Sequence, residues 1–101
     1  MADRGKPTRV TGDIAIKVGK GRIWMLVLEG GSEASSMDFH DHATEASGDP
    51  IVGITAPFHA DGDHSQSTVP LDFTSVGGIP FHTGIWCNWE GTGAVGYVWF
   101  E

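Results

Sequence analysis

The sequence GIWCNWEGTGAVGYVWFE, Gly84 to Glu101, decides the fold of this chain. Residues 85–90 alternate between two sets of side chains, which is the pattern of a strand with one buried face. Residues 94–100 form a second run of aromatic and β-branched side chains. Between them, Glu90-Gly91-Thr92-Gly93 is a strong turn signal. These features predict a closing β-hairpin.

The second strand of this hairpin is strongly apolar, and three of the four tryptophans lie within residues 84–101. An apolar strand with an open edge pairs with other chains and promotes aggregation. No polar tail follows the strand to shield it. We therefore expect it either to lie in the middle of a sheet or to be covered by a neighbouring subunit.

The rest of the sequence predicts further short strands separated by polar or glycine-rich turns. These strands are expected at residues 9–18, 22–29, 35–41, 51–58 and 69–73. Pro70 indicates an edge strand, because proline cannot donate a ladder hydrogen bond. The run RIWMLVLE, residues 22–29, is apolar at almost every position. Both of its faces must therefore be covered, one by the core and one by something else.

Seven or eight short strands of this kind predict an all-β fold, an antiparallel, jelly-roll-like β-sandwich. Residues 1–8 are expected to be an extended basic arm, and residues 9–101 a single domain. The single cysteine, Cys87, excludes an intrachain disulfide. No apolar run approaches about 18 residues, and the N-terminus lacks the apolar segment of a signal peptide. We expect a soluble protein made in a cytoplasm, with no membrane partner.

Charge is segregated along the chain. All six basic residues fall within residues 1–22, against two acidic residues there. Residues 23–101 contain eleven acidic residues and no Lys or Arg. Such a body would repel phosphate, so we expect no direct binding to nucleic acid. The basic residues either lie beside acidic neighbours within the fold or form an arm that reaches another subunit.

The histidines are the candidates for a metal site. His40 and His42 are two apart, so on a strand they would project from one face. His59 and His64 flank Asp61 and Asp63 in a loop, and His82 follows later. The His-x-His followed by Glu45 is similar to half of a cupin metal motif, but the spacing of the remaining ligands does not fit. We prefer the alternative that these histidines and acidic residues are solvated polar residues that bind no metal.

Signatures of catalysis are missing from the sequence. Cys87 is flanked by Trp86 and Trp89, where a thiolate is disfavoured, so a core cysteine is expected. The glycines near residues 77–78 and 91–96 lack the strand–loop–helix context of a phosphate loop. We expect a protein that is not an enzyme and needs no cofactor. The aromatic residues Trp86, Trp89, Tyr97 and Trp99 suit either packing at a core or interface, or a platform for sugars.

Two segments resemble small virion proteins of tailed bacteriophages. The segment DFTSVGGIPFHTGIWCNWEGTGAVGYVWFE, residues 72–101, resembles their C-terminal pattern of a glycine-rich closure, an aromatic strand, GTGAV and a final apolar strand. The segment RIWMLVLEGGSEASSMDFHD, residues 22–41, is similar to their upstream strand–turn–strand pattern. The resemblance implies a small β-sandwich that decorates or cements a particle. It also implies that interfaces, and not an active site, carry the function.

The function expected from the sequence is therefore that of a virion structural protein, most simply a capsid decoration or cement protein. It would be made in the host bacterial cytoplasm, bind the major capsid protein or other virion proteins, and form a homo-oligomer, with a trimer favoured. The expected interface residues are Arg4, Lys6 and Arg9 in the arm, and Trp86, Tyr97, Trp99 and Phe100 in the core or between protomers. The alternatives are a receptor- or glycan-binding module of a tail or fibre, and a cupin-like metal protein that uses His40, His42 and a third histidine.

Overall fold

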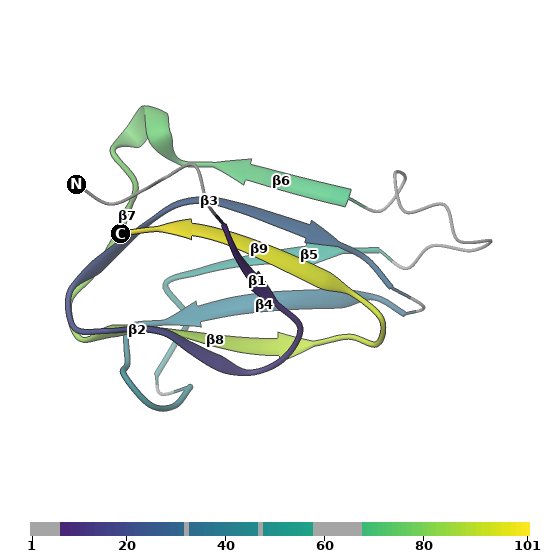
Figure 1. Cartoon of the computed structure of the whole chain (residues 1–101), viewed down its shortest axis with the longest axis horizontal. Helices are drawn as coiled ribbons and strands as arrows, with labels where there is room; N and C mark the ends of the chain where they lie inside the picture. Colours follow the sequence, from purple (N-terminus) through teal and green to yellow (C-terminus); the bar gives the residue numbers. More distant parts are fainter. Residues whose placement is uncertain (1–6, 32, 47, 58–67) are drawn as a thin grey trace.

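A computed structural model describes residues 7–31, 33–46, 48–57 and 68–101. This part of the chain is built from strands and one short 3-10 turn, η2 (Thr74–Val76) (Figure 1). The strands are β1 (Thr8–Val10), β2 (Ile14–Val18), β3 (Gly21–Glu29), β4 (Ser35–His40), β5 (Val52–Ala56), β6 (Thr68–Asp72), β7 (Ile79–Phe81), β8 (Gly84–Glu90) and β9 (Val95–Phe100). The described residues contain no helix long and apolar enough to cross a membrane.

The strands form two antiparallel sheets that pack face to face, so the predicted β-sandwich is confirmed. Sheet A has the order β1-β9-β3-β6, and β7 also pairs with β3. Sheet B has the order β2-β8-β4-β5. The described residues hold nine strands in place of the seven or eight expected. The seven expected segments become nine strands because residues 9–18 divide into β1 and β2, and because β7 pairs with β3 beyond β6, from which it is separated by η2 and its flanking residues.

The pairing pattern is that of a jelly roll. When β6 and β7 are counted as one interrupted strand, β1 pairs with β9, β2 with β8, β3 with β6 and β7, and β4 with β5. Each pair joins strands that are progressively closer in sequence, which is the nested pairing of an eight-stranded jelly roll. The pairs β3–β9 and β4–β8 then complete the two sheets.

The closing hairpin predicted at residues 84–101 is wrong. β8 pairs with β2 and β4 in sheet B, whereas β9 pairs with β1 and β3 in sheet A. The segment 91–94 therefore crosses from one sheet to the other as an arch. Gly91 and Gly93 have φ angles of 140° and 74°. Glycine adopts such angles without strain, so the turn signal was real although the turn does not join paired strands.

The single strand predicted at residues 9–18 is also divided between the sheets. β1 belongs to sheet A and β2 to sheet B, with a crossing at residues 11–13. Thr8, which the sequence assigned to the arm, is the first residue of β1. Ile14 and Val18 are 44% and 71% exposed. They lie on β2, which is the edge strand of sheet B.

Two expectations about individual strands are confirmed. β9 lies between β1 and β3, so the apolar last strand is an interior strand of sheet A. Pro70 lies on β6, at the edge of the same sheet. In Figure 1, β6 runs along the top of the molecule and the C-terminus lies near β7 at the left end.

The core lies between the two sheets. Its buried apolar residues are Val10, Ile23, Leu26, Leu28, Met37, Phe39, Ile54, Ala56, Phe81, Ile85, Cys87, Ala94 and Val98. Both sheets contribute to it, and burial of each large member stabilises the fold by about 1.5–3 kcal/mol relative to an exposed position. Phe100 packs against this cluster and is not available on an outer face.

Candidate functional site

The outer face of sheet A is apolar near its centre. On β9, Gly96 and Val98 are buried between the sheets, so Tyr97 and Trp99 project from the opposite face. Tyr97 lies directly opposite Val27 on β3. Residues directly opposite on neighbouring strands share a face. The outer face of β9 is therefore continuous with that of β3.

A bulge in β3 enlarges this apolar surface. The register between β3 and β9 shifts between Ile23 and Met25, and Ile23 faces the core. Trp24 and Met25 are successive residues, yet both are half-buried and neither packs against the core cluster. A β-bulge disrupts strict alternation and so permits this arrangement. Met25 lies opposite Trp99 on β9.

We refer to this surface as the sheet A patch. It comprises the side chains of Trp24, Met25, Val27, Val95, Tyr97 and Trp99. All are half-buried, and none belongs to the core cluster or packs against it. Contiguous apolar side chains on an outer face mark an interaction site more often than scattered ones do. The unbroken apolar run at residues 22–29 had indicated that the second face of this strand needs a cover.

Charged residues border the sheet A patch on opposite edges. Arg9 on β1 lies opposite Tyr97 and is exposed. Asp72 on β6 lies opposite Met25 and is also exposed. The Asp72 carboxylate accepts hydrogen bonds from the backbone N–H (2.9 Å) and the hydroxyl (2.7 Å) of Thr74. These two bonds lower the pKa of Asp72 from its ordinary value of 3.8, a value at which the carboxyl group is already ionised at neutral pH.

One end of the sheet A patch is fixed by polar contacts. The Trp24 indole N–H donates to the Glu101 carboxylate at 3.1 Å. The Arg22 guanidinium lies 5.9 Å from the centroid of the Trp24 ring, and its Nη1 donates to the Gly77 carbonyl at 2.7 Å. A cation over an indole ring is attracted by the negative face of the ring. The orientation of Trp24 is thus held from two sides.

Three of the basic residues gather at this same end. Lys17, Lys20 and Arg22, together with Gly21 and Glu101, line a depression of about 430 Å³. Of the predicted arm residues, Arg9 is placed on β1, whereas Arg4 and Lys6 lie outside the described residues. The described cations therefore lie within the fold, on β1 and around the β2–β3 turn.

The outer face of sheet B has a different character. Its side chains, in register across three strands, are Trp86, Asn88 and Glu90 on β8, Ser36, Asp38 and His40 on β4, and Thr55 on β5. Apart from Trp86 this set is polar, with two carboxylates. The predicted interface aromatics are thus divided. Tyr97 and Trp99 share the sheet A patch, Trp86 lies on the opposite face, and Phe100 packs on the core.

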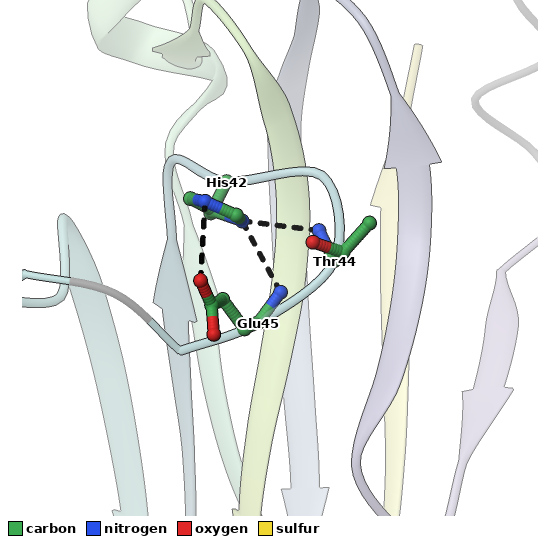
Figure 2. A network of polar contacts seen from close by, with 3 residues as sticks. All are labelled: His42, Thr44 and Glu45. Atoms are coloured by element: carbon green, nitrogen blue, oxygen red, sulfur yellow. Dashed lines mark hydrogen bonds and ion pairs between the residues drawn. The ribbon is translucent and has the colours of Figure 1, made fainter.

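The predicted histidine cluster is not brought together in the described residues. His40 ends β4 and is 6% exposed, and its Nδ1 is buried with no hydrogen-bond partner. His42 lies beyond the strand; its Nδ1 accepts from the backbone N–H of Thr44 (3.1 Å) and of Glu45 (3.2 Å). Its Nε2 lies 3.7 Å from the Glu45 carboxylate (Figure 2). His42 thus organises its own turn.

A metal centre is not found in the part of the chain that the structure describes. Among those residues, no group of three or more His, Cys, Asp or Glu side chains is arranged to hold a metal ion. His82 contributes its backbone N–H, which donates to the Asp41 carboxylate at 3.0 Å. His59 and His64 lie outside the described residues.

Cys87 is a core residue, as expected. It is buried on β8, and burial raises the pKa of its thiol to about 12, with smaller contributions from the negative charges of Asp13 and Asp38. A thiol with such a pKa is protonated at neutral pH and is a poor nucleophile. A second depression, of about 510 Å³, is lined by small and polar residues at positions 34–36 and 55–57 together with Glu90. It brings no second titratable side chain to Glu90, so it offers no acid–base pair.

Comparison with known proteins gives no further guidance. No protein-family model matches the sequence, no curated protein matches it, and no solved structure matches the fold.

Proposed function

We propose that this chain is a non-enzymatic structural protein of a tailed-bacteriophage virion, a capsid decoration or cement protein that works by burying surface. The observation that carries the proposal is the sheet A patch, an apolar surface with a charged border on a sandwich whose other outer face is polar. Protein interfaces commonly combine an apolar, aromatic centre with a polar rim.

Two further observations support the proposal. Residues 22–41 and 72–101 resemble the motifs of small phage virion proteins. The jelly-roll strand order is shared by many viral capsid domains, although also by lectins and cupins. A fold hosts many functions, so the strand order supports the proposal only in combination with the surface.

The proposed mechanism is thermodynamic. A copy bound to the particle through the sheet A patch contributes interface that exists only in the assembled shell. Binding to the assembled state alone shifts the equilibrium toward that state. Particle symmetry repeats the same modest contact many times, so a small free energy per copy gives a large total.

The basic arm supplies the second contact in this proposal. Arg4 and Lys6, with Arg9 at its base, would reach an acidic surface of a capsid protein or of a neighbouring subunit. The truncated protein that tests the arm must retain Pro7 and all later residues, because Thr8–Val10 form β1 and pair with β9. We expect the truncated protein to keep its thermal stability and to lose binding to heads. Full occupancy by the truncated protein would remove the arm from the mechanism.

The experiment that tests the function is mass spectrometry and antibody labelling of purified particles from the phage that encodes the chain. We expect many copies per particle, located on the head. Heads stripped of the protein should rebind the wild type and a Thr55→Glu variant, since Thr55 lies on the polar face of sheet B. They should not rebind Val27→Glu, which places a charge at the centre of the sheet A patch. Absence of the protein from purified particles would refute the proposal.

A glycan-binding module of a tail or fibre is the second candidate. It is favoured by the partly exposed side chains of Trp24, Tyr97 and Trp99 on one face of one sheet, because aromatic faces stack on sugars. A glycan array separates the two candidates. Saturable binding that is lost in Trp99→Ala, together with labelling of tails in place of heads, would favour this function over decoration.

A further inference from the structure

We propose that the sheet A patch pairs with the same patch of a second copy of this chain, about a two-fold axis that runs along the strands between β9 and β3. This inference rests on the proposed function, because it concerns the same surface: in solution a second copy covers the sheet A patch, and dissociation of the pair frees the patch for the particle. The pairing differs from the trimer favoured by the sequence. It follows from the positions of charges on the two edges of sheet A.

The centre of the sheet A patch suits a contact between identical surfaces. Tyr97 and Val27 form one cross-strand row, and Trp99 and Met25 form the next. These four uncharged side chains lie on the two interior strands of the sheet. A two-fold axis between β9 and β3 places β9 of one copy over β3 of the other. Large side chains of one copy then meet those of its partner in a self-complementary contact.

The borders of the patch carry opposite charges. Arg9 is exposed on β1, which is one edge of sheet A, and Asp72 is exposed on β6, which is the other edge. Rotation about an axis along the strands places β1 of each copy over β6 of the other. Arg9 lies in the same cross-strand row as Pro70, and Asp72 is two residues further along β6. An extended arginine side chain spans that separation, so two symmetric Arg9–Asp72 contacts flank the apolar centre.

The same charges disfavour the other simple arrangement. An axis across the strands would place β1 over β1 and β6 over β6. Arg9 of one copy would then lie near Arg9 of the other, and Asp72 of one copy near Asp72 of the other. Like charges brought together across an interface are destabilising and select against that register. Asp72 is an exposed carboxylate that is ionised at neutral pH, so this selection operates there.

Sedimentation analysis of the full chain over a wide concentration series tests the pairing. We expect a reversible monomer–dimer equilibrium in the wild type. Arg9→Glu should weaken the dimer about tenfold or more, because it creates two like-charge contacts. Asp72→Asn should weaken it less, since it removes two attractive contacts and keeps an oxygen for the Thr74 N–H. The exchanged pair Arg9→Asp with Asp72→Arg should recover affinity relative to Arg9→Asp alone.

The controls separate folding from pairing. Circular dichroism melting confirms that each variant is folded, and Thr55→Asp on sheet B should dimerise like the wild type. A wild type that stays monomeric at every concentration, a trimer, or a dimer that is unaffected by Arg9→Glu would overturn the inference. These outcomes leave the proposed function testable on its own, because labelling of heads does not require pairing in solution and a monomer still presents the sheet A patch to them.

Discussion

Gly96 of β9 lies against the side chain of Met37 on β4, where sheet A and sheet B meet. A methyl group at Gly96 would overlap the Met37 sulfur, and it would lie 2.8 Å from Met37 Cε and 3.2 Å from the Trp89 ring. Both sheets approach closely at this point because residue 96 has no side chain. Glycine at this position is therefore a packing requirement.

We predict that Gly96→Ala lowers the free energy of unfolding by about 1–3 kcal/mol, the usual cost of overpacking a core. Chemical denaturation with urea measures this difference. Gly12→Ala is the matched control, since a methyl group at Gly12 meets nothing within 4 Å. Its effect should stay within about 0.5 kcal/mol. Equal stability of the two variants would mean that Met37 moves aside without cost.

Asp41 ties the end of β4 to the β7–β8 connection. Its carboxylate accepts backbone N–H bonds from His82 (3.0 Å), Thr83 (2.7 Å) and Gly84 (3.3 Å). Partial burial by itself raises the pKa of Asp41. The three hydrogen bonds and the charge of His82 outweigh burial and lower the pKa from its ordinary value of 3.8.

We predict that Asp41→Ala destabilises the fold by about 1–2 kcal/mol at pH 7, comparable to removal of a helix cap. Because the folded-state pKa is lowered, the stabilisation is fully present above the ordinary value of 3.8 and is lost as pH falls through the lower folded-state pKa. The gap between wild type and Asp41→Ala should therefore narrow at acidic pH in urea titrations. Asp49→Ala, at an exposed position, should show no such gap. A gap that persists unchanged at the lowest pH would exclude the carboxylate as its source.

Cys87 provides a probe of whether the sandwich opens. Burial, followed by the charges of Asp13 and Asp38, raises its thiol pKa to about 12. We predict no reaction with a thiol-specific reagent in native protein at pH 8 and full reaction in denaturant. Stoichiometric labelling of the native protein would show that β8 is exposed in solution. Cys87→Ser should cost about 1–3 kcal/mol, because it buries a hydroxyl group in an apolar core.

The sequence predicted the fold class but not the sheet to which each strand belongs. Alternation reports which side chains face the core. In a sandwich the inner faces of both sheets face the same core, so Cys87 on β8 and Val98 on β9 are buried whether the two strands pair or lie in opposite sheets. For the same reason, β1 and β2 were expected as one strand. Nested long-range pairing decides the sheet to which each strand belongs, and the local alternation of side chains does not indicate that pairing.

The sequence predicted only part of the candidate site, because the rest depends on which strands pair. The unbroken apolar run of β3 showed that its second face needs a cover, and this face became the sheet A patch. Tyr97 and Trp99 joined it because β9 is paired to β3. Trp86 and Phe100 are equally aromatic, but register places Trp86 on sheet B and Phe100 on the core. Residue type alone did not distinguish these positions.

The arch between β8 and β9 gives the last prediction. Buried Gly31 packs on the backbone of this arch, where a methyl group would overlap the Thr92 carbonyl and lie 2.6 Å from both Gly93 C and Ala94 N. At Gly96 the obstructing atoms belong to a flexible methionine, whereas here they belong to the main chain. We therefore predict that Gly31→Ala costs more than Gly96→Ala, about 3 kcal/mol or more.

Thermal melting and urea denaturation of Gly31→Ala, Gly96→Ala and Gly12→Ala, measured together, test this order. If residues 84–101 formed a simple hairpin, the turn at residues 91–94 would lie at the tip of paired strands and Gly31 would tolerate a methyl group. A large loss of stability in Gly31→Ala thus supports the arch itself. A variant as stable as Gly12→Ala would contradict the crossing between sheets and, with it, the jelly-roll order on which the sheet A patch depends.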